Sequence, residues 1–233
     1  MRSNRAVEPI TPSFSDDDDM STLDQAFAHP DPSVRLNAAL RAGIEPSLRD
    51  LDALLNRCAV EPDFQVRETL TWALIRLPAE VVVPRLIGEL SREEAQARRQ
   101  ALHTLSKFRD ASAWKAVAAR LDDEDQGVVR TAWYAAVALV PKNQRHWLAE
   151  KLALSLGRGD RDIQLSLSRA LVGLGSDIIE PMLTAAEGCD DEAVRLHAAA
   201  TQRLLHDPDA GFAPSLNSAR REVALGKTRS TKG

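Results

Sequence analysis

The side chains that most often bind metals or act as nucleophiles are few and scattered in this chain. It has two cysteines, Cys58 and Cys189, and five histidines: His29, His103, His146, His197 and His206. None of them belongs to a His-Glu pair, a His-x-x-x-His pair or a cysteine metal spacing. Gly157-Arg158-Gly159 lacks the preceding strand that a dinucleotide site needs, and no nucleophile elbow is present. We therefore expect no catalytic residue, no metal and no cofactor.

A second group of residues recurs at regular intervals. Short runs of the form acid-x-x-Val-Arg, some with substitutions, start at residues 31, 63, 94, 126, 160 and 191. Such even spacing is the signature of an internal repeat. The recurring arginines are Arg35, Arg67, Arg98, Arg130 and Arg195. We expect each to pair with the recurring acid of an adjacent unit, a structural role that we favour over the alternative of a phosphate-binding ladder.

Each run opens a helical pattern. When its Val-like residue is counted as zero, apolar residues fall at +4 and +8, which is one stripe of an amphipathic helix. The acid at −3 is then placed to cap the helix, as in Asp31, Asp63, Asp160 and Asp191. In the fourth unit this count takes Val129 as zero and Trp133 as a core residue.

A second helical pattern separates these helices, over residues 46–58, 79–90, 111–121, 144–156 and 176–187. Each unit is thus an antiparallel pair, which we name helix A and then helix B. Pro78 and Pro141 follow B helices, where proline ends one helix and starts the next. Gly43 and Gly175 are expected at left-handed helix ends.

Composition agrees with an all-helical chain. Leu and Ala are abundant and only 4% of the 233 residues are aromatic, which favours helices and argues against an all-β fold. No apolar stretch approaches the roughly 20 residues of a membrane span. The first 19 residues hold no signal-peptide core. With only two cysteines, a reducing cytoplasmic location is expected.

Charge is unevenly distributed around a net value of −4. Residues 1–32 carry a balance of −5 and residues 220–233 a balance of +4. We expect a disordered acidic segment at 1–20, a repeat domain at 21–224 and a disordered basic tail at 225–233. A final helix at 214–225 is expected to cover the last repeat.

Over residues 21–206 the chain resembles the HEAT-repeat family, and within it the short class called PBS lyase HEAT-like. The shared pattern is acid-x-x-Val-Arg-x-x-Ala-x-x-x-Leu, from which Gln126 and Gln164 depart. The resemblance implies an all-α, right-handed α-solenoid of about six helix pairs. It also implies a non-catalytic scaffold that binds other molecules.

A binding surface is predicted on the B helices, which usually line the concave side of such solenoids. Positions +2, +3 and +6 point away from the core stripe, and in the fourth unit they are Thr131, Ala132 and Ala135. We predict that a protein partner contacts the ridge formed by Glu68, Trp72, Arg99, His103, Thr131 and Arg169. Tryptophan and arginine often dominate the energy of protein interfaces. The alternative reading is a solvated face with one incidental tryptophan.

Two other functions remain open. HEAT-like DNA glycosylases bind nucleic acid through a strongly basic concave surface, but here the repeat region carries −3, so this use is less favoured. A bilin lyase-like role in chromophore handling follows from the name of the repeat class alone. We expect no membrane association and a monomeric chain, and the identity of the partner is not encoded in any motif.

Overall fold

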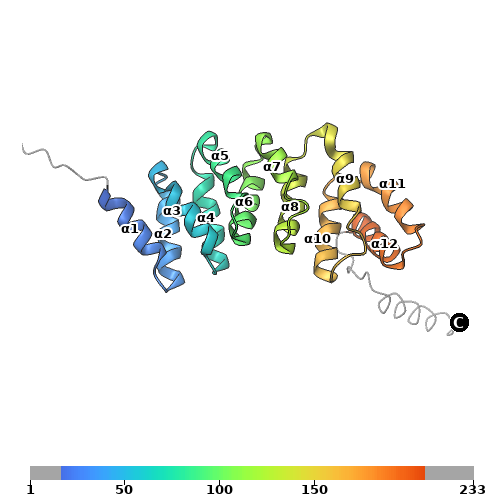
Figure 1. Ribbon diagram of the computed structural model, residues 1–233, viewed down its shortest axis with the longest axis horizontal. Coiled ribbons are helices and arrows are strands. Elements are labelled where there is room, and N and C mark those ends of the chain that lie inside the picture. Colours follow the sequence, from blue (N-terminus) through green and yellow to red (C-terminus); the bar gives the residue numbers. More distant parts are fainter. Residues whose placement is uncertain (1–16, 208–233) are drawn as a thin grey trace, which may run out of the picture.

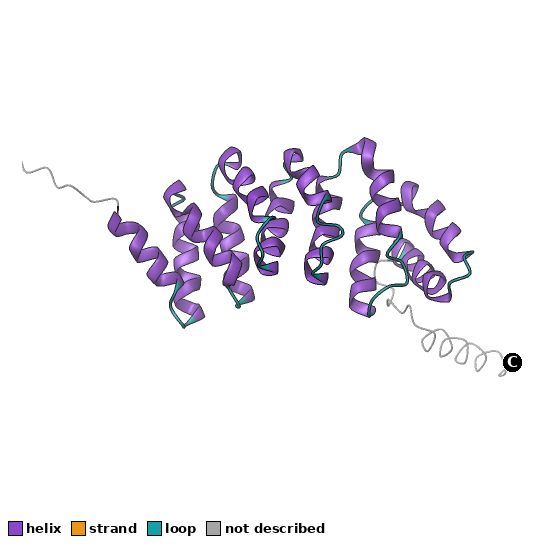
Figure 2. Cartoon of the chain, in the orientation of Figure 1, coloured by secondary structure: helices purple, strands orange, loops and turns teal. Residues whose placement is uncertain are grey.

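The structure is a computed structural model that describes residues 17–207. Within this range all regular elements are helices (Figure 2). They form six pairs: α1 (Asp17–Phe27) and α2 (Pro32–Ile44), α3 (Leu51–Val60) and α4 (Phe64–Ile75), α5 (Ala79–Glu89) and α6 (Ala95–Phe108), α7 (Trp114–Ala118) and α8 (Gln126–Leu139), α9 (Arg145–Ala153) and α10 (Arg161–Val172), α11 (Ser176–Glu187) and α12 (Glu192–His206). The pairs stack in one row, with α1 and α12 near opposite ends (Figure 1). The predicted all-α solenoid is confirmed.

Three predicted segments lie wholly or mostly outside the described residues. They are the acidic N-terminal segment, the helix at 214–225 and the basic tail at 225–233. Helix α1 begins at Asp17, so it takes in the end of the segment expected to be irregular at 1–20.

The predicted caps of the B helices are confirmed. The carboxylates of Asp31, Asp63, Asp160 and Asp191 each accept hydrogen bonds from backbone N–H groups in the first turn of the helix. These N–H groups have no partner within the helix, so each cap stabilises its helix by about 1 kcal/mol. Glu94 makes no such bond with its side chain.

Helix α8 corrects the register expected for the fourth repeat. Its N-cap is Asp125, whose Oδ1 accepts from the N–H of Val128 at 2.9 Å. Val128 therefore occupies position zero, one residue earlier than the sequence pattern suggested. Consequently Ala132 and Ala135, expected on the ridge, are fully buried. The shift also moves Arg130 to position +2, where it is exposed.

One of the two glycines expected at helix ends is placed differently. Gly175 has a φ of 99° and precedes α11, a conformation that favours glycine. Gly43, in contrast, lies inside α2 and is buried. Its role is to let another side chain approach the helix, as described below.

The recurring arginine holds the loop that leads into its own B helix. In four repeats the Nη1 atom donates to the backbone carbonyls five and six residues earlier, at 2.7–3.0 Å. The arginines are Arg35, Arg67, Arg98 and Arg195. In the fifth repeat Gln164 donates to the carbonyls of Gly157 and Gly159 in a similar way.

Arg35 and Arg98 also pair with an acid of the next repeat, although not with the recurring capping acid. Arg67, Arg130 and Arg195 pair with no acid between residues 17 and 207, so the predicted pairing is wrong for them. Arg35 donates to both carboxylate oxygens of Glu61 at 2.8 Å, and Arg98 Nη2 lies 2.8 Å from Asp123 Oδ1. Each acid lies two residues before the capping aspartate. Each also contacts an arginine at the end of its own A helix, Arg57 for Glu61 and Arg120 for Asp123. These clusters join consecutive repeats.

Glu61 is held as a buried carboxylate. Its side chain is fully buried, and burial alone would raise its pKa. Hydrogen bonds from Arg35, from the N–H of Asp63 and from Arg57 outweigh burial and lower the pKa to about 2. The carboxylate is therefore charged at all physiological pH values.

Tryptophans of the A helices pack against each other. The rings of Trp114 and Trp147 are edge-to-face, with centroids 6.1 Å apart. Trp114 is buried and donates from Nε1 to Gln144 Oε1 at 2.6 Å.

Trp133 lies on the B helix α8 and is only 4% exposed, which confirms that it is a core residue.

Candidate functional site

Two depressions lie between consecutive B helices, and together they contain all six residues of the predicted ridge. The apolar depression lies between α2 and α4, and its lining includes Leu36, Leu40, Phe64, Glu68 and Trp72. The basic depression spans α6, α8 and α10, and its lining includes Arg99, His103, Arg130, Thr131, Tyr134, Ser166 and Arg169. The linings repeat the same helical positions, mainly +2, +3 and +6, along the row.

The apolar depression owes its character to side chains that the core does not cover. The exposed fraction is 66% for Phe64, 38% for Leu40 and 36% for Trp72. The guanidinium carbon of Arg67 lies 5.9 Å from the centre of the Phe64 ring. Aromatic side chains that remain partly exposed are well suited to contact a partner.

Gly43 provides the space in which Trp72 lies. A Cβ atom built on Gly43 would come within 2.0 Å of Cζ3 in the Trp72 ring. The indole of one repeat therefore rests on the helix backbone of the preceding one, which fixes its position.

The basic depression contains three guanidinium groups from three successive B helices. Arg99 and Arg169 are exposed and have no hydrogen bond or ion pair with any residue between 17 and 207. Arg130 Nε donates to Ser166 Oγ at 3.1 Å. Among residues 17–207, no aspartate or glutamate lines this depression. The result is a local excess of positive charge on a chain whose net charge is −4.

Tyr134 and Thr131 also line the basic depression. Tyr134 is 57% exposed, and the Thr131 hydroxyl donates to the carbonyl of Gly127 within its own helix at 2.8 Å. Arg99 crosses over Gly127, where a Cβ atom would lie 2.9 Å from its Nη1. Gly127 thus leaves room for Arg99 to extend across α8.

His103 links the two depressions. Its Nε2 atom lies 3.1 Å from Glu68 Oε1, which is ion-pair distance, although the geometry is not that of a hydrogen bond. Burial is the main reason that the pKa of His103 is lowered; Lys107 also lowers it and Glu68 opposes the change. The imidazole is therefore mainly neutral near pH 7, and the permanent charge of the basic depression comes from the arginines.

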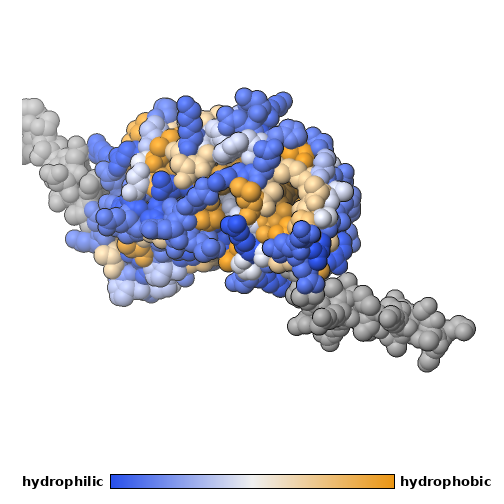
Figure 3. Space-filling model, turned by 45° about the vertical axis from the view of Figure 1, so that its right-hand side comes forward, coloured by the Kyte–Doolittle hydropathy of each residue, from blue (hydrophilic) through white to orange (hydrophobic). Residues whose placement is uncertain are grey.

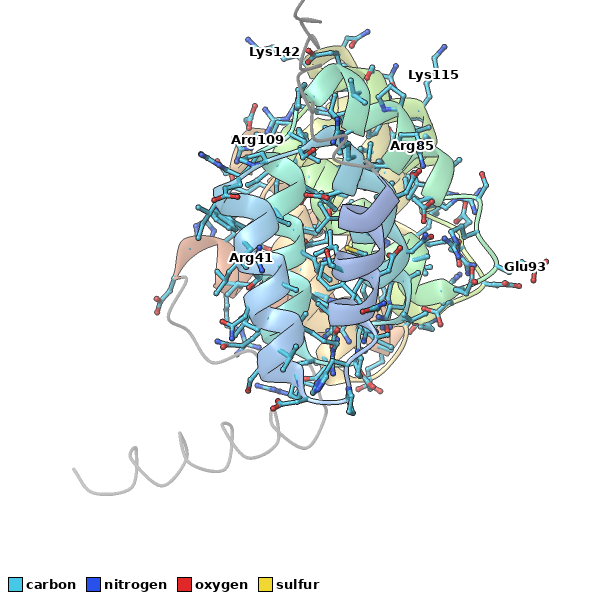
Figure 4. The ribbon with its side chains drawn as sticks, turned by 90° about the vertical axis from the view of Figure 1, so that its left-hand side faces the viewer. Arg41, Arg85, Glu93, Arg109, Lys115 and Lys142 are labelled. Atoms are coloured by element: carbon cyan, nitrogen blue, oxygen red, sulfur yellow. The ribbon has the colours of Figure 1, made fainter. Side chains whose placement is uncertain are left out.

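The face of the molecule shown in Figure 3 is mostly hydrophilic, with apolar patches between the polar side chains. Figure 4, in which the left-hand end of Figure 1 faces the viewer, labels several charged residues. Lys115 and Lys142 project from one edge of the molecule in that view, well apart from Arg41 on α2. Both lysines are exposed and line neither depression.

Cys58 and His197 are residues of chemically reactive types, and both are buried. Burial raises the pKa of the Cys58 thiol to about 12, so this cysteine is a poor nucleophile. His197 is fully buried; its Nδ1 accepts from the N–H of Gly157 at 3.0 Å, and its Nε2 lies 3.0 Å from the Gln164 carbonyl and from Ser168 Oγ.

Between residues 17 and 207 no group of three or more His, Cys, Asp or Glu side chains is arranged to hold a metal ion. None of the helices in this range is long and apolar enough to cross a membrane.

All six residues of the predicted ridge line the two depressions, but the sequence pattern left out other lining residues, among them Arg130 and Tyr134 of the basic depression. Counting the fourth repeat from Val129 places Arg130 among the recurring structural arginines at +1 and Tyr134 at +5. Counting from Val128 places them at +2 and +6, the positions that face the depression. Asp125 carries the signal that corrects the count: it is the acid three residues before Val128 and the natural N-cap.

Residues 51–138 match a family model described as HEAT repeats. This match is consistent with a HEAT-repeat protein and covers the central part of the solenoid. It does not distinguish the PBS lyase class. HEAT repeats commonly form scaffolds that interact with other proteins.

Two engineered proteins with solved crystal structures resemble the chain. One is 17% identical with a TM-score of 0.46, covering 83% of this chain and 99% of that one. The other is 18% identical with a TM-score of 0.43, covering 81% and 95%. No curated protein matches the sequence.

Proposed function

We propose that the protein is a non-catalytic scaffold that binds a protein partner on the B-helix face, through the apolar and basic depressions. A solenoid presents equivalent residues of successive repeats along one surface, which suits it to bind an extended partner. Trp72 is partly exposed there, and Arg99 and Arg169 are exposed.

The observation that carries the proposal is the pair of uncompensated arginines beside exposed aromatic side chains. The structural arginines, such as Arg35 and Arg98, are buried in ion pairs with an adjacent repeat. Arg99 and Arg169 are at positions +2 and +6, and no described acid pairs with them. Arginine and aromatic groups left available in this way are typical of interface residues with large binding energies.

An affinity purification from the native cell tests the proposal. The wild type is compared with the Trp72→Ala/Arg99→Ala double variant and with a Lys115→Ala/Lys142→Ala control. We expect at least one partner to be retained by the wild type and the control and to be depleted about tenfold or more by the double variant. Thermal unfolding of all three proteins establishes that the fold is intact.

Two results would contradict the proposal. One is a partner that the Trp72/Arg99 variant retains fully. The other is a partner that the lysine control loses equally, since that would indicate a general effect of charge. Purification of the same partner at raised ionic strength separates the apolar contribution, which salt does not screen, from the charged one.

A further inference from the structure

We propose that the partner binds as a linear acidic segment, with an apolar side chain in the depression around Trp72 and carboxylates in the depression around Arg99, Arg130 and Arg169. This inference rests on the proposed function and names the chemistry of the partner. It follows from the different linings of two depressions that share one face.

The acidic residues of the proposed peptide are inferred from charge complementarity with the basic depression. Three guanidiniums from α6, α8 and α10 surround the basic depression, and its lining within residues 17–207 contains no carboxylate. Bringing like charges together is unfavourable unless a counter-charge is present, and a guanidinium forms strong paired hydrogen bonds with carboxylates. His103 and Thr131 add polar groups between the arginines. An acidic peptide satisfies all of these groups at once.

The apolar residue of the proposed peptide is inferred from the exposed apolar surface between α2 and α4. Leu36, Leu40, Phe64 and Trp72 line the depression between α2 and α4, and the aromatic pair is well exposed. An aliphatic or aromatic side chain placed there would remove this surface from water, which is worth roughly 25 cal/mol per Å² of apolar area. Such an anchor also sets the register of the charged residues that follow.

The distance between the two depressions suits a short extended chain. Neighbouring helices pack about 8–10 Å apart, and an extended chain advances about 3.3 Å per residue. Roughly eight residues would therefore cross from α4 to α10. Glu68 lines the apolar depression on the side of the basic one, since it lies 3.1 Å from His103 of the basic depression. We therefore expect the part of the peptide that passes Glu68 to be uncharged.

The same features argue against a nucleic acid in this position. A phosphate backbone carries regular negative charge, and it would meet Glu68 and the apolar depression as well as the arginines. Binding driven by phosphates requires many cations along its path. Here three guanidinium groups line one depression, whereas the other is lined by Leu36, Leu40, Phe64 and Trp72 together with the acid Glu68.

Selection from a display library of random linear peptides tests this inference on the folded full-length chain. The bait is the wild type, and the readout is the Asp and Glu content of the selected peptides and the position of their apolar residue. We expect peptides with one apolar residue at one end and two or more acids at the other. A synthetic copy with Gln in place of each acid should bind about tenfold or more weakly.

Variants assign the selected peptides to the two depressions. We expect Arg99→Glu/Arg169→Glu to weaken the acidic peptide by about tenfold or more. Lys115→Glu/Lys142→Glu, which makes the same change in net charge elsewhere, should weaken it less than about twofold, because exposed charges beyond the Debye length are screened. Trp72→Ala should weaken both the acidic peptide and its glutamine copy.

The remaining outcomes overturn the inference in distinguishable ways. Selected peptides that lack acids but depend on Trp72 would refute the acidic partner and leave the proposed function standing. Selected peptides that are indifferent to Trp72, Arg99 and Arg169 would refute both. Tighter binding of a labelled random-sequence DNA duplex than of any acidic peptide, lost in Arg99→Glu/Arg169→Glu, would assign the surface to nucleic acid.

Discussion

The Trp72 ring lies over Gly43 of the preceding repeat, so closely that a Cβ atom on Gly43 would come within 2.0 Å of the indole. This contact connects the binding face to the packing of α2 against α4. Because glycine at this point leaves room for the indole, the exposed edge of Trp72 has a defined position on the surface.

The first prediction concerns this contact. Gly43→Ala should displace the Trp72 ring and destabilise the protein by about 1–3 kcal/mol, the usual effect of overpacking. Gly88→Ala is the matched control, since Gly88 is an exposed glycine in α5 whose Cβ atom would meet no described side chain or other helix within 4 Å. It should stabilise by about 0.5–1 kcal/mol. Urea unfolding of both variants measures the two changes, and equal effects would refute the contact.

The second prediction concerns the buried cluster at Glu61. Glu61→Gln should destabilise the protein by about 3–5 kcal/mol, because it leaves Arg35 and Arg57 buried without a counter-charge. Glu93→Gln, at an exposed acid on the surface shown in Figure 4, should change the free energy of unfolding by less than about 0.5 kcal/mol. Chemical denaturation distinguishes the two. A small effect at Glu61 would mean that this cluster does not hold consecutive repeats together.

The third prediction is a loss of stability in mild acid that depends on His197. Burial lowers the pKa of His197 to about 4, despite a favourable bond to the Gln164 carbonyl. The unfolded imidazole takes up a proton below about pH 6.5, whereas the folded one resists until about pH 4. Stability should therefore be fully present above pH 6.5 and fall as the pH drops toward 4, by on the order of 3 kcal/mol.

Thermal unfolding of wild type and His197→Gln between pH 7 and pH 4 checks this dependence. The variant should be less stable at pH 7 but should lose less stability on acidification. Burial lowers the pKa of His103 as well, so His103→Gln serves as the comparison. If the pH dependence followed His103 and not His197, the assignment to the buried histidine would be wrong.

The extent to which sequence predicts this protein depends on the kind of feature. The helix pairs, the N-caps and the arginines that hold the loop before each B helix can be predicted from short stretches of sequence. Asp31 and Arg35 illustrate this, because each bonds to backbone groups within six residues of itself. Pairing of Arg35 with the adjacent repeat was also predictable, although the acid proved to be Glu61 and not a capping aspartate. That choice depends on how two repeats pack, which local spacing does not encode.

The proposed binding face is a part of the structure that local sequence rules predict incompletely. Repeat four contains two adjacent valines, and a count from Val129 places Tyr134 and Arg130 outside the ridge. Only the cap at Asp125, whose hydrogen bond to Val128 fixes the start of α8, resolves this ambiguity. Similarly, Gly43 has the sequence position of a helix end, but Trp72 from the next repeat requires it within α2. Both errors arise because the deciding contact or cap lies outside the pattern being counted.

Photo-crosslinking tests the central claim, that the B-helix face binds a protein partner, most directly. A photoreactive amino acid is placed at Thr131, within the basic depression, or at Lys115, which lines neither depression, and the protein is irradiated in its native cell. The account predicts a discrete crosslinked protein from position 131 that is absent from position 115 and is lost when Arg99 and Arg169 are replaced by glutamate. A crosslinked protein that forms from position 115 but not from position 131 would contradict it.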